Sequence, residues 1–184
     1  MSDFITMAHG NGGGAMQKLI NELFVEAFAN PLLAQGEDQA RLPLAPLVAS
    51  GDQLAFSTDS FVIDPIFFPG GNIGKLAVCG TLNDVAVCGA YPRYLSCGFI
   101  LEEGLPFSEL QAVVEAMAKT ARDAGVQIVT GDTKVVQKGA VDKIFINTAG
   151  IGVIPQGLDW GMHRIEAGDQ IIVSGTLGEH GATI

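Results

Sequence analysis

Four aspartates lie in short polar motifs that suit them to binding a cation. A single aspartate in such a place most often only forms a turn. Four carboxylates near a loop that can hold phosphate, however, are the hard oxygen ligands that Mg²⁺ and a polyphosphate require. We therefore predict a Mg²⁺ site formed by Asp52 in Ser-Gly-Asp-Gln, Asp59 in Ser-Thr-Asp-Ser, Asp84 in Leu-Asn-Asp-Val and Asp132 in Thr-Gly-Asp-Thr.

A glycine-rich leader at residues 10–14, Gly-Asn-Gly-Gly-Gly, directly precedes a predicted helix. Backbone N–H groups at the start of a helix converge on anions, and the helix dipole favours negative charge there. The leader is not a P-loop, because the Gly-Lys-Ser/Thr ending is missing, and no strand precedes it as a dinucleotide motif requires. We predict that Gly10, Gly12 and Gly13 contact phosphates; the alternative is an unstructured N-terminal segment.

Lys134 and Asp84 are the candidate catalytic residues. Lys134 follows Asp132 at the end of a predicted apolar strand, where a cation can reach a transferring phosphoryl group. The alternative is an exposed loop lysine. Asp84 falls in the middle of a predicted helix, off the apolar stripe of Leu82 and Val85, so its carboxylate must face water, a cation or another element.

Three cysteines lie at positions 79, 88 and 97, without a Cys-x-x-Cys pair. This pattern argues against a disulfide framework and against a structural zinc site, and it favours a reducing cytoplasm. Cys79 and Cys88 lie about 13.5 Å apart along one predicted helix and cannot bridge one another. We expect both to be packed in the core.

The elements that must position these residues follow from hydrophobic periodicity. Apolar residues at helical spacing predict a helix over residues 16–28. Residues 32–51 are predicted to be a loop, residues 54–59 and 61–63 a strand, and residues 64–71 a connector rich in proline and glycine.

Asn72 is the predicted N-cap of a second helix that runs to about residue 88. A third helix is predicted from Ser108, which forms a capping-box pattern with Gln111, to Gly125. Its stripe consists of residues 110, 113, 114, 117, 118 and 121. Residues 94–101, 126–130, 143–153 and 170–174 are predicted strands. Helices interleaved with about five strands indicate a mixed α/β or α+β domain.

Composition excludes several functional classes. The 184 residues carry 20 acidic and 10 basic side chains, a net charge of −10, which argues against a basic nucleic-acid groove. No run approaches the roughly 18–20 apolar residues of a membrane span, and no signal peptide is evident. With 48% hydrophobic residues, the chain can form one substantial core.

Taken together, these motifs resemble an ATP-binding superfamily that includes aminoimidazole ribonucleotide synthetase, selenophosphate synthetase and thiamine-monophosphate kinase. The matching pieces are the glycine-rich leader and residues 57–60, 83–90 and 131–133. Residues 9–13, 64–84 and 131–136 resemble, more specifically, the HypE family of hydrogenase maturation proteins. The run Pro-Ile-Phe-Phe-Pro-Gly-Gly at residues 65–71 is not expected of the sister enzymes.

The resemblance implies an α+β fold in which a mixed β-sheet, a half-barrel, is flanked by helices and the barrel is completed by dimerisation. Residues 1–165 would form the ATP-binding, dimer-forming domain, and residues 166–184 would begin a second, C-terminal domain. The implied cofactors are ATP and Mg²⁺. Nucleotide-binding roles fall on Gly10, Gly12, Gly13, Asn83, Asp59 and Asp132.

The implied activity is the ATP-dependent dehydration of an S-carboxamide on the C-terminal cysteine of the same protein to a thiocyanate. The implied partners are a second copy of the chain, the carbamoyltransferase HypF and a HypC-HypD complex, with no role for nucleic acid or a membrane. The last cysteine here is Cys97, so we expect this chain alone to be inactive. The alternatives are a non-catalytic dimerisation and docking module, or a small-molecule kinase or selenophosphate synthetase.

Overall fold

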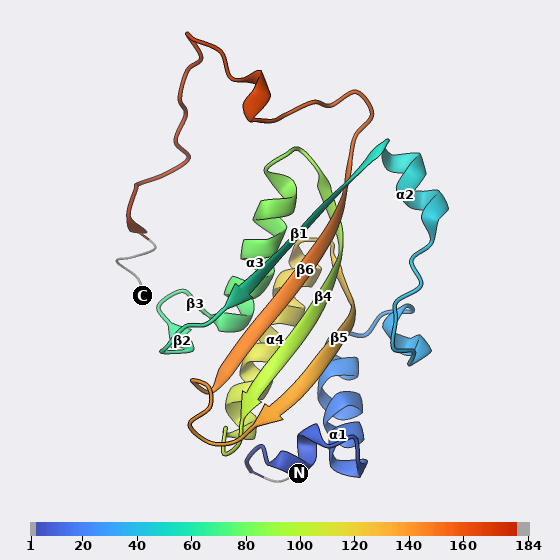
Figure 1. Cartoon of the computed structure of the whole chain (residues 1–184), viewed down its shortest axis with the longest axis vertical. Coiled ribbons are helices and arrows are strands. Elements are labelled where there is room, and N and C mark those ends of the chain that lie inside the picture. Colours follow the sequence, from blue (N-terminus) through green and yellow to red (C-terminus); the bar gives the residue numbers. More distant parts are fainter. Residues whose placement is uncertain (1–2, 180–184) are drawn as a thin grey trace.

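A four-stranded mixed sheet with helices on one face forms the centre of the molecule (Figure 1). The structure, a computed structural model, describes residues 3–179. The strand order is β1-β6-β4-β5, in which β4 and β5 are parallel and the other pairs are antiparallel. The strands are β1 (Gln53–Phe61), β4 (Tyr91–Glu102), β5 (Gln127–Val136) and β6 (Ile144–Ile154), and a small hairpin joins β2 (Phe67–Phe68) to β3 (Gly71–Asn72). The structure confirms the predicted α+β class.

Two long helices cover the sheet. Helix α3 (Ile73–Ala86) begins at the predicted N-cap, where the side chain of Asn72 accepts hydrogen bonds from the backbone N–H groups of Gly74 and Lys75 at 3.0 and 3.1 Å. All six residues of the predicted stripe of helix α4 (Phe107–Asp123) are buried. The predicted capping box at Ser108 is wrong. The extended residue Pro106 is the N-cap, which places Ser108 inside the first turn.

The predicted helix over residues 16–28 is confirmed, with an internal change of geometry. It starts as α1 (Gly14–Leu19), continues as a π-helix (Ile20–Val25) and keeps helical geometry to about Phe28. The ring of Phe24 stacks on that of Phe99 with centroids 4.9 Å apart, which fixes the helix against β4. This first helix therefore covers the same face of the sheet as α3 and α4.

Several predicted boundaries are wrong for identifiable reasons. Residues 32–51 are not all loop, because they contain a short 3-10 helix (Leu33–Gln35) and helix α2 (Leu44–Ser50). Helix α2 buries only Leu47, so the sequence shows no amphipathic stripe there. No strand forms at residues 170–174, where the side chains of Ile171 and Ile172 are 94% and 90% exposed, respectively. The last helical element before this segment is a 3-10 helix (Met162–Arg164).

Within residues 3–179, the opposite face of the sheet carries no helix (Figure 1). Phe56, Ile151 and Tyr94 share one cross-strand row on this open face, and the side chain of Phe56 is 70% exposed. Within residues 3–179, no helix has both the length and the apolar character needed to cross a bilayer.

Candidate functional site

Helix α3 and strand β1 bring two of the predicted aspartates to one seam. The hydroxyl of Ser57 donates a hydrogen bond to Oδ2 of Asp84 at 3.2 Å, so the mid-helix carboxylate faces another element, which is one of the three environments that its position off the stripe allowed. Asp59 follows Ser57 by two residues and lies on the same face of β1. Both carboxylates are exposed to solvent.

Gly80 explains how β1 comes so close to α3. A Cβ atom at this position would lie 2.8 Å from the ring of Phe61 and 3.9 Å from Oδ2 of Asp59. Gly80 precedes Asp84 by four residues, so both lie on the side of α3 that faces β1. Asn83 neighbours Asp84 on the same helix. Ser57 lies in the Ser-Thr-Asp-Ser motif, but the sequence alone predicted no role for its hydroxyl.

The second group of predicted residues lies on β5, at the other edge of the sheet. The ammonium group of Lys134 lies 3.2 Å from the carboxylate of Asp132, and both side chains are 63% exposed. Lys134 lies inside β5, which continues to Val136, rather than in a loop. An ion pair this exposed contributes little to stability, so both groups are available to a ligand.

The glycine-rich leader lies beside the same strand. A 3-10 helix (Met7–Gly10) precedes it, and the backbone of Gly10 packs so closely on Val135 that a Cβ atom would lie 2.9 Å from the Val135 nitrogen. Gly12 has a left-handed φ of 74°, which glycine adopts without strain. The leader is therefore a docked segment of the fold, against the alternative of an unstructured one.

A single chain does not gather all four aspartates around one ion. Asp59 and Asp132 lie on edge strands at opposite sides of the sheet, three strand spacings or about 14 Å apart. Asp52 precedes Asp59 by seven residues of extended chain, about 23 Å. No group of three or more His, Cys, Asp or Glu side chains that could hold a metal occurs within the described residues.

The three cysteines are free thiols. Cys97 is buried under the first helix, and desolvation raises the pKa of its thiol, so it stays protonated. Cys79 and Cys88, which were expected in the core, are only half-buried.

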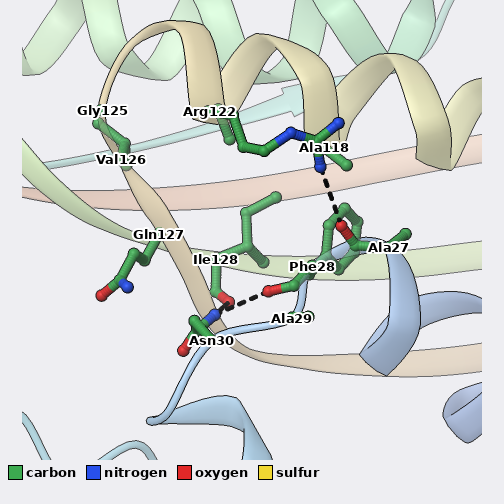
Figure 2. A pocket seen from close by; sticks show the side chains of 11 residues that line it. Ala27, Phe28, Ala29, Asn30, Ala118, Arg122, Gly125, Val126, Gln127 and Ile128 are labelled. Atoms are coloured by element: carbon green, nitrogen blue, oxygen red, sulfur yellow. Dashed lines mark hydrogen bonds between the residues drawn. The ribbon is translucent and has the colours of Figure 1, made fainter.

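Two cavities lie next to the first helix. The larger, about 460 Å³, opens between this helix and β5, with Phe24 and Phe99 in its wall and Asp38 and Asp132 among its polar groups. The smaller, about 260 Å³, lies where the first helix ends near α4 (Figure 2). There Arg122 donates to the Ala27 carbonyl at 3.3 Å, and the amide of Asn30 donates to the carbonyls of Phe28 and Ile128 at 2.8 Å. The two side chains thus provide hydrogen-bond donors to backbone carbonyls where the end of the first helix packs against α4 and β5.

Comparison with known proteins assigns the fold to a family. The model of the AIR synthase related protein, N-terminal domain, matches residues 36–154. Carbamoyl dehydratase HypE of Escherichia coli strain K12 is 74% identical over 180 residues, which cover 98% of this chain and 54% of that protein. The chain thus spans about half the length of the relatives it matches.

Solved structures agree with this assignment. The crystal structure of E. coli HypE superposes with a TM-score of 0.88 at 74% identity, covering 91% of this chain and 52% of that one. A structure of the hydrogenase maturation protein HypE in complex with ATP matches with a TM-score of 0.76 at 59% identity, covering 81% and 43%. A HypE-HypF complex matches with a TM-score of 0.57 at 51% identity, covering 77% and 44%.

Proposed function

The chain belongs to the AIR synthase related family, and from that premise we propose that it forms the ATP-binding half of a carbamoyl dehydratase. The complete enzyme would dehydrate an S-carboxamide on its own C-terminal cysteine to a thiocyanate, which supplies cyanide for maturation of a nickel-iron hydrogenase. The observation that carries this proposal is the 74% identity to carbamoyl dehydratase HypE along 98% of the chain.

The proposed chemistry needs ATP for a physical reason. The oxygen of an amide is a poor leaving group, and phosphorylation by ATP converts it into phosphate. One N–H proton is lost as the oxygen is phosphorylated, and loss of phosphate with the second N–H proton then gives the nitrile of the thiocyanate. The protein's part in such a transfer is to position the phosphoryl group and to offset its charge. The match to a HypE structure in complex with ATP supports nucleotide binding by this half.

We assign the nucleotide-binding role to two groups of residues. Asp59 and Asp84, with Asn83 beside them, offer exposed carboxylate oxygens at one seam, and such oxygens fit Mg²⁺. When bound, Mg²⁺ would offset phosphate charge. The second group combines the cation of Lys134 and the carboxylate of Asp132 with the backbone N–H groups of the leader. That group comprises Gly10, Gly12, Gly13, Asp132 and Lys134.

A second copy of the chain is the simplest way to unite the two groups. They lie at opposite edges of one sheet, about 14 Å apart, which is too far for one ion to bridge. In a two-fold dimer, one edge of a sheet can lie beside the other edge of its partner. We therefore propose a homodimer in which the sheets of the two copies join into one barrel, with the helix-free face of each sheet turned inward. Asp52, at the far end of β1, would reach the same ion only from another copy.

The further proposed partners are HypF and a HypC-HypD complex. A solved HypE-HypF complex, which matches 77% of this chain, supports the first. The second rests on the proposed fate of the cyanide group. We also propose that residues 1–165 form the nucleotide-binding domain and that residues 166–184 begin the next one; residues 180–184 lie outside the described part of the chain. The three free thiols favour a reducing cytoplasm.

Titration of this chain with ATP tests the proposal. We expect saturable binding by calorimetry that requires Mg²⁺, and at least a tenfold loss of affinity in Asp84→Asn. Asp123→Asn is the matched control, because Asp123 is exposed on α4 and pairs only with Lys119. If the chain dimerises without binding ATP, the docking-module alternative is favoured. Equal affinities of wild type and Asp84→Asn would contradict the proposed role of this carboxylate.

A further inference from the structure

Two buried threonines join helix α3 to β6, one of the two inner strands of the sheet. Thr81 of α3 and Thr148 of β6 are both fully buried, and their hydroxyl oxygens lie 2.6 Å apart. The Thr148 hydroxyl also donates to the carbonyl of Ala77 at 3.1 Å. A hydroxyl has a single proton, so Thr81 must be the donor to Thr148.

The surface of β6 under α3 offers little else to set the position of the helix. Gly150 and Gly152 face α3 without side chains, and a Cβ atom at Gly150 would lie 3.0 Å from the methyl groups of Thr81 and Val85. Apolar packing on a smooth glycine surface tolerates small shifts along the strand, because it is not directional. A hydrogen bond in a low-dielectric core is directional and costly to leave unmade.

The threonine pair is connected to the elements that carry both carboxylates of the α3 and β1 seam. Thr81 precedes Asp84 by three residues, about one helical turn. Thr148 is the register partner of Asp59 on β1, and the hydroxyl of Thr58 donates to the Thr148 carbonyl at 3.0 Å. The same threonine of β6 is thus bonded both to the helix that carries Asp84 and to the strand that carries Asp59.

We propose that Thr81 and Thr148 are positioning residues that hold α3 where Asp84 faces Ser57 and Asp59, and so preorganise these carboxylates for a divalent cation. This inference rests on the proposed function and deepens it. The pair touches no ligand and acts only through the position of the helix. A shift of about 1 Å in a preorganised site is enough to weaken it strongly.

Valine variants separate positioning from stability. In T81V or T148V a buried hydroxyl loses a partner, so each single variant should melt below wild type. The double variant T81V/T148V replaces both partners by groups of similar shape and should recover most of the lost stability. Thr120→Val is the matched control, because Thr120 makes its own hydrogen bond, to the Ala116 carbonyl, on α4.

Two measurements decide the proposal. We expect the Mg²⁺ concentration for half-maximal ATP binding to rise about tenfold in T81V/T148V and to stay unchanged in Thr120→Val. We also expect amide hydrogen exchange over residues 82–86 to accelerate in the double variant, while α4 keeps its protection. If wild type shows no Mg²⁺-dependent ATP binding, the proposed function fails. If wild type binds and the double variant matches it in either measurement, the positioning role is overturned.

Discussion

The thiol of Cys97 is enclosed by the sheet and the first helix, and this burial controls its reactivity. Desolvation raises the pKa of the thiol, so raising the pH toward 9 does not ionise it in the folded protein. We expect iodoacetamide at pH 8 to modify the half-buried Cys79 and Cys88 first and to reach Cys97 only on unfolding. Mass spectrometry of the alkylated chain checks this. Early modification of Cys97 under native conditions would contradict the burial.

Gly10 is a residue at which one methyl group should displace the leader. In Gly10→Ala the new Cβ would lie 2.9 Å from both the backbone nitrogen and the Cβ of Val135, so the leader must move off β5. We expect ATP affinity to fall about tenfold to a hundredfold, because the phosphate-binding N–H groups lose their position.

Gly14→Ala serves as the control for this change. Nothing lies within 4 Å of a Cβ atom at Gly14, which begins α1, so the substitution should leave the leader in place. The two variants are compared by calorimetric titration with ATP and by limited proteolysis of the leader. Equal affinities of the two variants would show that the docking of Gly10 is irrelevant to binding.

The residue types of the candidate site could be predicted from the sequence better than their grouping. Asp84 lies off the apolar stripe of its helix, and that position predicts that its carboxylate faces water, a cation or another element; in the structure it accepts a hydrogen bond from Ser57 of β1. No local pattern indicates that Asp59 shares this seam while Asp132 does not. Their grouping depends on strand order, and strand order is a property of long-range pairing.

The N-terminus of α3 depends on one buried side chain. Asn72 caps two backbone N–H groups and also donates to the Ala112 carbonyl of α4 at 3.3 Å. We expect Asn72→Ala to lower the free energy of unfolding by about 1–2 kcal/mol. Asn72→Ser, which keeps a capping oxygen, should lose less. Urea denaturation followed by circular dichroism measures both, and equal losses would contradict the capping role.

Elements with a strong hydrophobic period could be predicted, and elements without one could not. The stripe of α4 is correct at all six positions because burial of one face requires that spacing. Helix α2 buries only one side chain and therefore has no buried stripe of this kind. Residues 170–174 show a strand-like apolar run, but a strand needs a pairing neighbour, and the described part of the chain provides none there.

The helix-free face of the sheet is the proposed interface between two copies of the chain. Phe56 lies in an apolar row with Ile151 and Tyr94 and is 70% exposed in a single copy. If a second copy covers this face, Phe56→Glu places a charge in the interface and should convert the dimer to monomer. Leu44→Glu is the control, because Leu44 is 66% exposed and belongs to α2 rather than to a strand of the sheet. Sedimentation of both variants tests this, and a Phe56→Glu dimer would contradict the proposed interface.

The topology of the sheet also imposes an order on folding during synthesis. In the part of the chain that the structure describes, β1 pairs only with β6, and Phe61 pairs with Ile146, about 85 residues later. At a synthesis rate of roughly 5–20 residues per second, β1 remains without its partner for about 4–17 seconds after it is made. During that time its apolar side chains have no native neighbour strand, so the newly made chain is most vulnerable to aggregation before β6 leaves the ribosome.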